Sequence, residues 1–76
     1  MLLRIHEKEN KHYYVVMGWL DKKKQNAPRY KKRFDIYDSA VDYFRDLLKK
    51  CKFVQIFENI GGKRKWIADS ENTENL

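Results

Sequence analysis

One segment of the chain has the spacing of an amphipathic helix, and its shortness limits the folds that the chain can adopt. Between positions 37 and 48 the apolar residues recur every three or four positions. Acidic residues come early in this segment and lysines come late, which complements the helix dipole. We predict one helix over residues 38–50 that packs through Ala40, Val41, Phe44, Leu47 and Leu48. One helix of this length can cover only one face of a sheet.

The segments before and after this helix have the composition and alternation of β-strands. Strands are predicted at 13–20, 29–36, 52–60 and 63–68, and residues 2–6 supply a possible fifth strand. The fold class is therefore α+β: a single small domain, residues 1–69, with an antiparallel sheet of four to five strands and one helix on one face. The element order is β-β-α-β-β or β-β-β-α-β-β. The acidic segment 70–76 has almost nothing to bury and is predicted to be a flexible tail.

The last hairpin indicates that both faces of the sheet are apolar. A two-residue turn at Gly61 and Gly62 places Ile60 opposite Lys63. It then pairs Phe57 with Trp66 on one face and Ile56 with Ile67 on the other. The strand over 13–20 is also apolar on both sides. The face without the helix therefore contacts a partner, is covered by the termini, or consists of half-buried aromatic rings beside long Lys and Arg stems.

Positive charge is concentrated in two parts of the sequence. The 76 residues carry 17 Lys+Arg and 11 Asp+Glu, a net charge of +6, and residues 22–33 hold seven cations and no acid. Such clusters can contact backbone phosphates and release counterions, and interleaved aromatic rings can stack on bases. We therefore predict a non-enzymatic protein that binds nucleic acid, DNA rather than RNA. The predicted contact residues are Lys22, Lys23, Lys24, Arg29, Tyr30, Lys31, Arg33, Lys63, Arg64 and Lys65.

A second hypothesis is a protein-interaction or inhibitor module of the kind found among accessory proteins of phages and mobile elements. Its partner would be an acidic protein surface or a second copy of the chain in a homodimer. It would use the aromatic residues of the second sheet face, Trp19, Phe53, Phe57 and Trp66. The two hypotheses predict different responses to salt, because phosphate contacts weaken steeply as salt rises.

Residues 19–48 comprise a strand, a basic loop, a basic strand ending in Lys32-Arg33-Phe34-Asp35, and an amphipathic helix that contains Ala40. This stretch resembles the AP2-like arm-binding domain of phage and transposon integrases. The resemblance implies a three-stranded sheet in the DNA major groove, backed by a helix, with Lys31, Arg33 and the loop lysines facing DNA. The chain departs from that family where no glycine precedes Phe34 and where Ile36 replaces the usual Thr or Ser cap, so membership is not assigned.

Other kinds of chemistry find little support in the sequence. No nucleophile has a nearby base, so no catalytic residues, cofactor or small-molecule substrate are predicted. His6 and His12 lack a third ligand close by, and no metal site is predicted. Cys51 is the only cysteine, which excludes an internal disulfide and fits a reducing, cytoplasmic setting. No apolar stretch is long enough to span a membrane.

Overall fold

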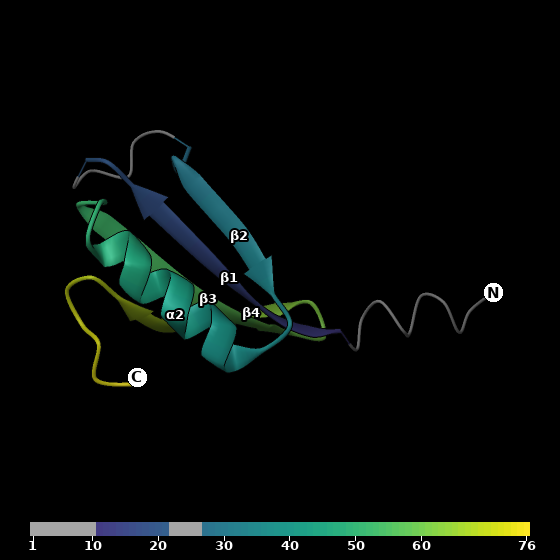
Figure 1. Ribbon diagram of the computed structural model, residues 1–76. Helices are drawn as coiled ribbons and strands as arrows, with labels where there is room; N and C mark the ends of the chain where they lie inside the picture. The colour runs from purple at the N-terminus through teal and green to yellow at the C-terminus, as the bar shows by residue number, and fades with distance from the viewer. Residues whose placement is uncertain (1–10, 22–26) are drawn as a thin grey trace.

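The computed structural model describes residues 11–21 and 27–76, which form four strands and one helix (Figure 1). The sheet is antiparallel throughout, with strand order β2-β1-β3-β4. The predicted α+β class, antiparallel sheet and single helix are confirmed for these residues. The predicted strand at 2–6 lies outside the described residues, which form four strands and not five. The elements are β1 (His12–Trp19), β2 (Tyr30–Phe34), α2 (Tyr37–Leu48), β3 (Phe53–Ile60) and β4 (Lys63–Asp69).

Helix α2 begins one residue earlier and ends two residues earlier than the sequence predicts. Ile36 precedes it with an extended backbone and no side-chain cap. At the other end, the Lys49 N–H donates to the Asp46 carbonyl at 3.2 Å and the Lys50 N–H donates to the Leu47 carbonyl at 3.1 Å. These bonds span three residues and tighten the last turn, which ends the helix. No helix in the described part of the chain is long and apolar enough to cross a membrane.

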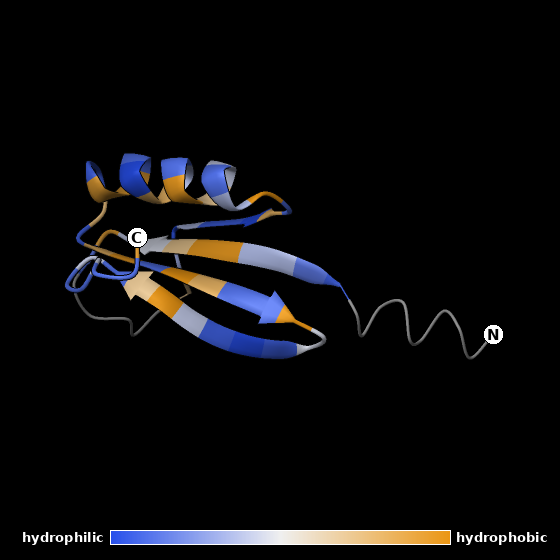
Figure 2. Ribbon diagram, turned by 90° about the horizontal axis from the view of Figure 1, so that it is seen from below, coloured by the Kyte–Doolittle hydropathy of each residue, from blue (hydrophilic) through white to orange (hydrophobic). Residues whose placement is uncertain are grey.

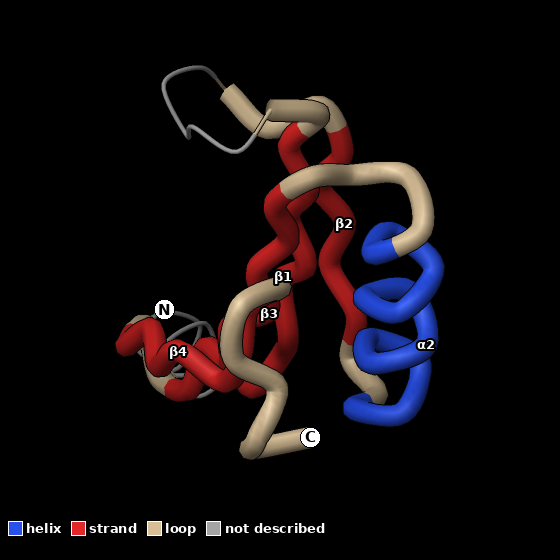
Figure 3. Tube along the Cα trace, turned by 90° about the vertical axis from the view of Figure 1, so that its left-hand side faces the viewer, coloured by secondary structure: helices blue, strands red, loops and turns tan. Residues whose placement is uncertain are grey.

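The main core lies between α2 and one face of the sheet. The apolar side of α2 faces the strands (Figure 2), and the helix packs on β1, β2 and β3 while β4 twists away from it (Figure 3). Of the residues predicted to pack, Val41 is half-buried and Leu48 remains 38% exposed because it lies in the last turn. The fully buried side chains of this core are Val16, Ala40, Phe44, Leu47, Val54, Ile56 and Ala68.

The end of α2 approaches β1 closely at Gly18. A Cβ at this position would lie 2.9 Å from the Cys51 Sγ and 3.0 Å from the Leu47 Cδ1. Gly18 therefore provides the space in which the helix exit lies against the strand. Burial raises the pKa of the Cys51 thiol, against the opposing effect of the Lys50 charge, so the thiol stays protonated in this contact.

The turn between β3 and β4 confirms part of the predicted register and corrects the rest. Gly61 and Gly62 have positive φ angles of 56° and 83°, and Ile60 pairs with Lys63 as predicted. Phe57 also pairs with Trp66, but the pairing shifts by one residue beyond this point. The prediction that Ile56 faces Ile67 is wrong, because a bulge brings Ala68 opposite Ile56. The bulge places the small Ala68 in the core.

Residues 70–76 make several contacts with the domain. The Ser70 N–H donates to the Val54 carbonyl at 2.9 Å, and the Asn75 side-chain amide donates to the Ile67 carbonyl at 2.9 Å. Leu76 packs against the main core. These contacts place the segment beside β3 and β4, whereas its flexibility stays a prediction.

We expect the substitution Gly18→Ala to destabilise the protein by about 1–3 kcal/mol, because the new methyl group overpacks the contact with Cys51 and Leu47. Urea unfolding monitored by circular dichroism measures the change. Cys51→Ala in the same chain removes the Sγ and should reduce the cost of Gly18→Ala relative to the single substitution. Equal stability of Gly18→Ala and the natural protein would show that the helix exit does not depend on this space.

Candidate functional site

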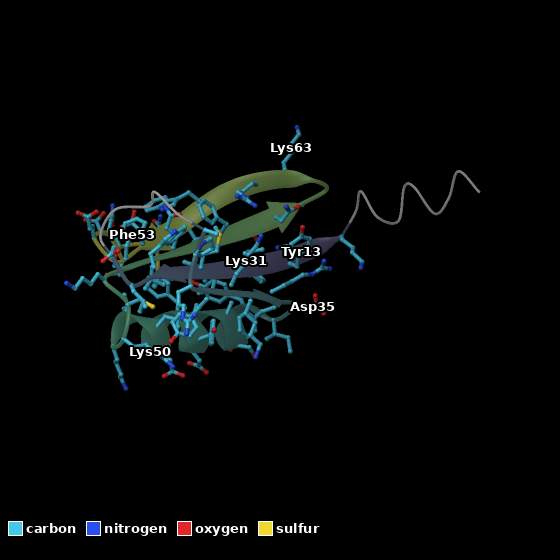
Figure 4. All side chains as sticks on the ribbon, turned by 90° about the horizontal axis from the view of Figure 1, so that it is seen from above. Tyr13, Lys31, Asp35, Lys50, Phe53 and Lys63 are labelled. Carbon is cyan, nitrogen blue, oxygen red and sulfur yellow. The ribbon has the colours of Figure 1, made fainter. Side chains whose placement is uncertain are left out.

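The candidate site is the face of the sheet that α2 does not cover, which we call the helix-free face. The strand register defines it, because Val15 pairs with Arg33 on β2 and with Phe57 on β3, and their side chains share one side of the sheet. In Figure 4, Lys50 lies beside the end of α2, whereas Tyr13, Lys31 and Phe53 lie over the strands. The register assigns to this face Tyr13, Val15, Met17, Trp19, Lys31, Arg33, Phe53, Gln55, Phe57, Asn59, Arg64, Trp66 and Asp69.

The centre of the helix-free face is a second apolar cluster. Val15, Met17, Trp19 and Phe53 are only 7–8% exposed, and Tyr13 and Phe57 pack against them, partly buried. The Trp19 and Phe53 rings lie 5.7 Å apart between centroids. The sheet therefore buries apolar side chains on both faces, as the alternation of the strand sequences predicts.

Two arginines from the edge strands lie over aromatic rings of the inner strands. The Arg33 guanidinium carbon on β2 is 3.8 Å from the centroid of the Tyr13 ring on β1, and that of Arg64 on β4 is 5.1 Å from the Phe57 ring on β3. Such stacking shields the rings and restricts the guanidinium groups. Beside them lies a groove of about 390 Å³ lined by Tyr13, Val15, Lys31, Lys32, Arg33 and Arg64.

The strands give the helix-free face an excess of positive charge. Lys31, Arg33 and Arg64 are exposed on it. Within the four described strands, the only acidic residue on this face is Asp69, which lies at the end of β4. The Asp69 carboxylate accepts hydrogen bonds from the N–H groups of Glu71 and Asn72, at 2.8 and 2.9 Å. The cations at the groove therefore have no carboxylate partner on this face among the described strand residues.

The structure separates the predicted contact residues into two groups. Lys31, Arg33 and Arg64 lie on the helix-free face, together with the aromatic residues of the second hypothesis, Trp19, Phe53, Phe57 and Trp66. The other described residues lie elsewhere. Tyr30 packs against the main core with the Lys50 Nζ 5.4 Å from its ring centroid. Lys63 and Lys65 pair with Ile60 and Glu58 on the opposite pleat, and Arg29 is exposed before β2. Lys22, Lys23 and Lys24 lie outside the described residues.

Tyr13 is a site residue that the sequence interpretation did not select. Its ring is the surface on which Arg33 stacks, and it lines the groove. The alternation of Tyr13 with Val15 and Met17 indicates that it shares their face. The contact of Tyr13 with Arg33 follows from the pairing of β1 with β2. Arg33 lies opposite Val15, which is two residues from Tyr13 on the same face of β1.

A polar cluster occupies the opposite pleat at the start of β1. The His12 Nε2 lies 2.6 Å from the Glu58 Oε2, and the Tyr14 hydroxyl donates a hydrogen bond to Glu58. Burial raises the pKa of Tyr14, and the Glu58 charge, this hydrogen bond and Tyr37 raise it further. A hollow of about 410 Å³ beside the cluster is also lined by Tyr37, Lys65, Trp66, Ile67 and Asn75. Trp66, which the register places on the helix-free face, therefore also borders this hollow, next to the bulge in β4. Residues 11–21 and 27–76 hold no group of three potential metal ligands.

The raised pKa of Tyr14 predicts a loss of stability in alkaline solution. Above about pH 10, its ordinary pKa, the phenol ionises in the unfolded chain but stays protonated in the folded chain. The unfolded chain then binds fewer protons, so the free energy of unfolding falls as the pH rises through the folded pKa. Urea unfolding at about pH 9 and about pH 11 should show a larger loss for the natural protein than for Tyr14→Phe. Equal losses would contradict this assignment.

The helix-free face can bind an anion through guanidinium and ammonium groups above an apolar floor. No protein-family model, curated protein or solved structure matches the chain. The resemblance of residues 19–48 to the AP2-like domain is accordingly without a matching family model. In the structure two strands precede α2 and two follow it, so β3 and β4 complete the sheet after the helix.

Proposed function

We propose that the protein binds DNA through the helix-free face of its sheet, without catalysing a reaction. The observation that supports this proposal is the groove lined by Lys31, Arg33 and Arg64, where Arg33 lies over the Tyr13 ring and Arg64 over the Phe57 ring. Among the described strand residues of the face, the one acidic residue is Asp69, which is engaged in a turn at the end of β4. The phosphates of the DNA backbone supply negatively charged partners for these cations, which have no carboxylate partner among the described strand residues of the face.

The state of the aromatic rings favours duplex DNA over a single strand. Single-stranded nucleic acid is usually bound by stacking successive bases on exposed rings. Here Arg33 covers Tyr13, Arg64 lies over Phe57, and Trp19 and Phe53 are buried. Trp66 is the ring of this face with substantial exposure, at 37%. The outermost groups above the inner strands are therefore hydrogen-bond donors. A duplex can accept hydrogen bonds from them without unstacking its bases.

The groove geometry of nucleic acids favours DNA over double-stranded RNA. The major groove of B-form DNA admits β-structure, whereas that of A-form RNA is too deep and narrow for side chains to read. A sheet face that carries guanidinium donors close above its inner strands fits the wider major groove of DNA. This argument agrees with what the resemblance of residues 19–48 implies.

Burial also distinguishes the proposal from the protein-interaction hypothesis. Residues that anchor protein interfaces are exposed aromatic side chains that become buried on binding. Trp19 and Phe53 are already 8% and 7% exposed, so they have little area left to bury. Phe57 is shielded by Arg64, which leaves Trp66 at the edge strand. The accessible part of the face is therefore cationic more than apolar.

Two exposed lysines of the edge strands provide a matched test. Lys31 on β2 lies on the helix-free face and lines the groove, whereas Lys65 on β4 pairs with Glu58 on the opposite pleat and does not line it. Lys31→Gln should weaken binding of a labelled DNA duplex and lower the slope of log affinity against log salt by about 1, as expected for one lost phosphate contact. Lys65→Gln should leave both unchanged. Fluorescence anisotropy at several salt concentrations between about 50 and 200 mM measures both quantities.

The same titration includes the outcomes that contradict the proposal. Equal effects of Lys31→Gln and Lys65→Gln would show that the charge acts without regard to the face that carries it. Absence of saturable binding by the natural protein at the lower salt would contradict DNA binding itself. Circular dichroism of each variant shows that the fold is kept.

A further inference from the structure

We propose that Arg33 and Arg64 read guanine bases in the DNA major groove, while Lys31 and Arg29 at the outer strand β2 contact phosphates. This inference rests on the proposed function and adds a base preference to it. Three features carry it: the position of the two guanidinium groups over the sheet, their short distances to aromatic rings, and the acceptor pattern of guanine.

The two arginines start on the outer strands but end over the inner strands. Arg33 belongs to β2 and Arg64 to β4, which are the two edges of the sheet. The rings beneath them, Tyr13 and Phe57, belong to β1 and β3, which are neighbours. Neighbouring strands lie about 4.8 Å apart, so both guanidinium groups lie near the middle of the face.

The middle of such a face meets the base edges when it enters the major groove. This groove is about 12 Å wide, with phosphates along both walls and base edges on its floor. Groups above the two inner strands therefore face the floor, and groups on the outer strands face the walls. Lys31 lies on the outer strand β2, and Arg29 is exposed at its start, so both are placed for phosphate contacts.

The chemistry of a stacked arginine suits guanine. Guanine presents two acceptors, N7 and O6, side by side in the major groove, and a guanidinium group can donate to both at once. A ring at 3.8 Å restricts the guanidinium of Arg33 before DNA arrives, so less side-chain freedom is lost when the two bonds form. A lysine ammonium has the same charge but lacks the planar pair of donors. The paired N–H donors of the guanidinium group, and not its charge alone, therefore determine the preference for guanine.

The test uses duplexes that differ only in one acceptor. Short duplexes containing guanine at many positions are compared with the same duplexes carrying 7-deazaguanine, which lacks the N7 acceptor, and with duplexes of adenine and thymine alone. Fluorescence anisotropy at one fixed salt concentration measures the affinity. The natural protein should bind the guanine duplexes about 5- to 150-fold more tightly than the other two, as expected for one or more bidentate contacts.

Charge-preserving variants identify the residues responsible. Arg33→Lys and Arg64→Lys should each reduce the preference for guanine and leave the salt dependence unchanged, because the number of cations is unchanged. Arg45→Lys is the matched control, since Arg45 is exposed on α2 and should leave the preference intact.

The possible failures are distinguishable. Tight, salt-dependent binding with equal affinity for all three duplexes would overturn the reading of guanine and leave the proposed DNA binding in place. Tighter binding to single strands than to duplexes would also overturn it, in favour of base stacking. No saturable binding to any of these DNAs would overturn both the inference and the proposed function.

Discussion

In the part of the chain that the structure describes, one helix of 12 residues packs on a four-stranded sheet that is apolar on both faces, and the arrangement depends on this fact. Helix α2 covers one face through Ala40, Phe44 and Leu47, which are completely buried. On the other face, long side chains from the edge strands do part of the shielding. Arg33 lies 3.8 Å from the Tyr13 ring, and Arg64 lies over Phe57. The aliphatic stems of such residues can cover apolar surface while their charged ends stay in water. Protection of the second face and its positive charge therefore come from the same side chains.

This arrangement of charged side chains has an electrostatic cost, which supports the proposal of an anionic partner. Cations gathered at one groove repel one another, and no carboxylate of the described strands lies among them. A fold that needed only to shield its rings would be served equally well by uncharged side chains of similar length. Charge that stabilises binding at the expense of the free protein is typical of functional sites. The contrast with α2 is informative, because Asp42, Arg45 and Asp46 intersperse both signs along its exposed side.

The sequence predicts the fold well wherever a single element determines the outcome. The spacing of Phe44 and Leu47 predicts the helix, and the paired glycines predict the turn that brings Phe57 opposite Trp66. The prediction fails at Ile67, because a bulge depends on how β4 fits against β3 and on the small size of Ala68, which no local pattern reveals. It also treats residues 63–65 as one basic cluster, although the pleat places Arg64 on one face and its two neighbours on the other. Charge counting finds cations, whereas alternation determines which of them act together.

The candidate site is less predictable than the fold because it is built from two hairpins that are remote in sequence. Arg33 reaches the centre of the helix-free face from β2, and Arg64 reaches it from β4. The two meet at one groove only because β1 and β3 are adjacent in the middle of the sheet. Gly18 contributes to this order, since it lets the exit of α2 lie against β1 and so connects the first hairpin to β3. A basic sequence alone yields a charged surface, whereas this strand order brings two arginines together above aromatic rings at one groove.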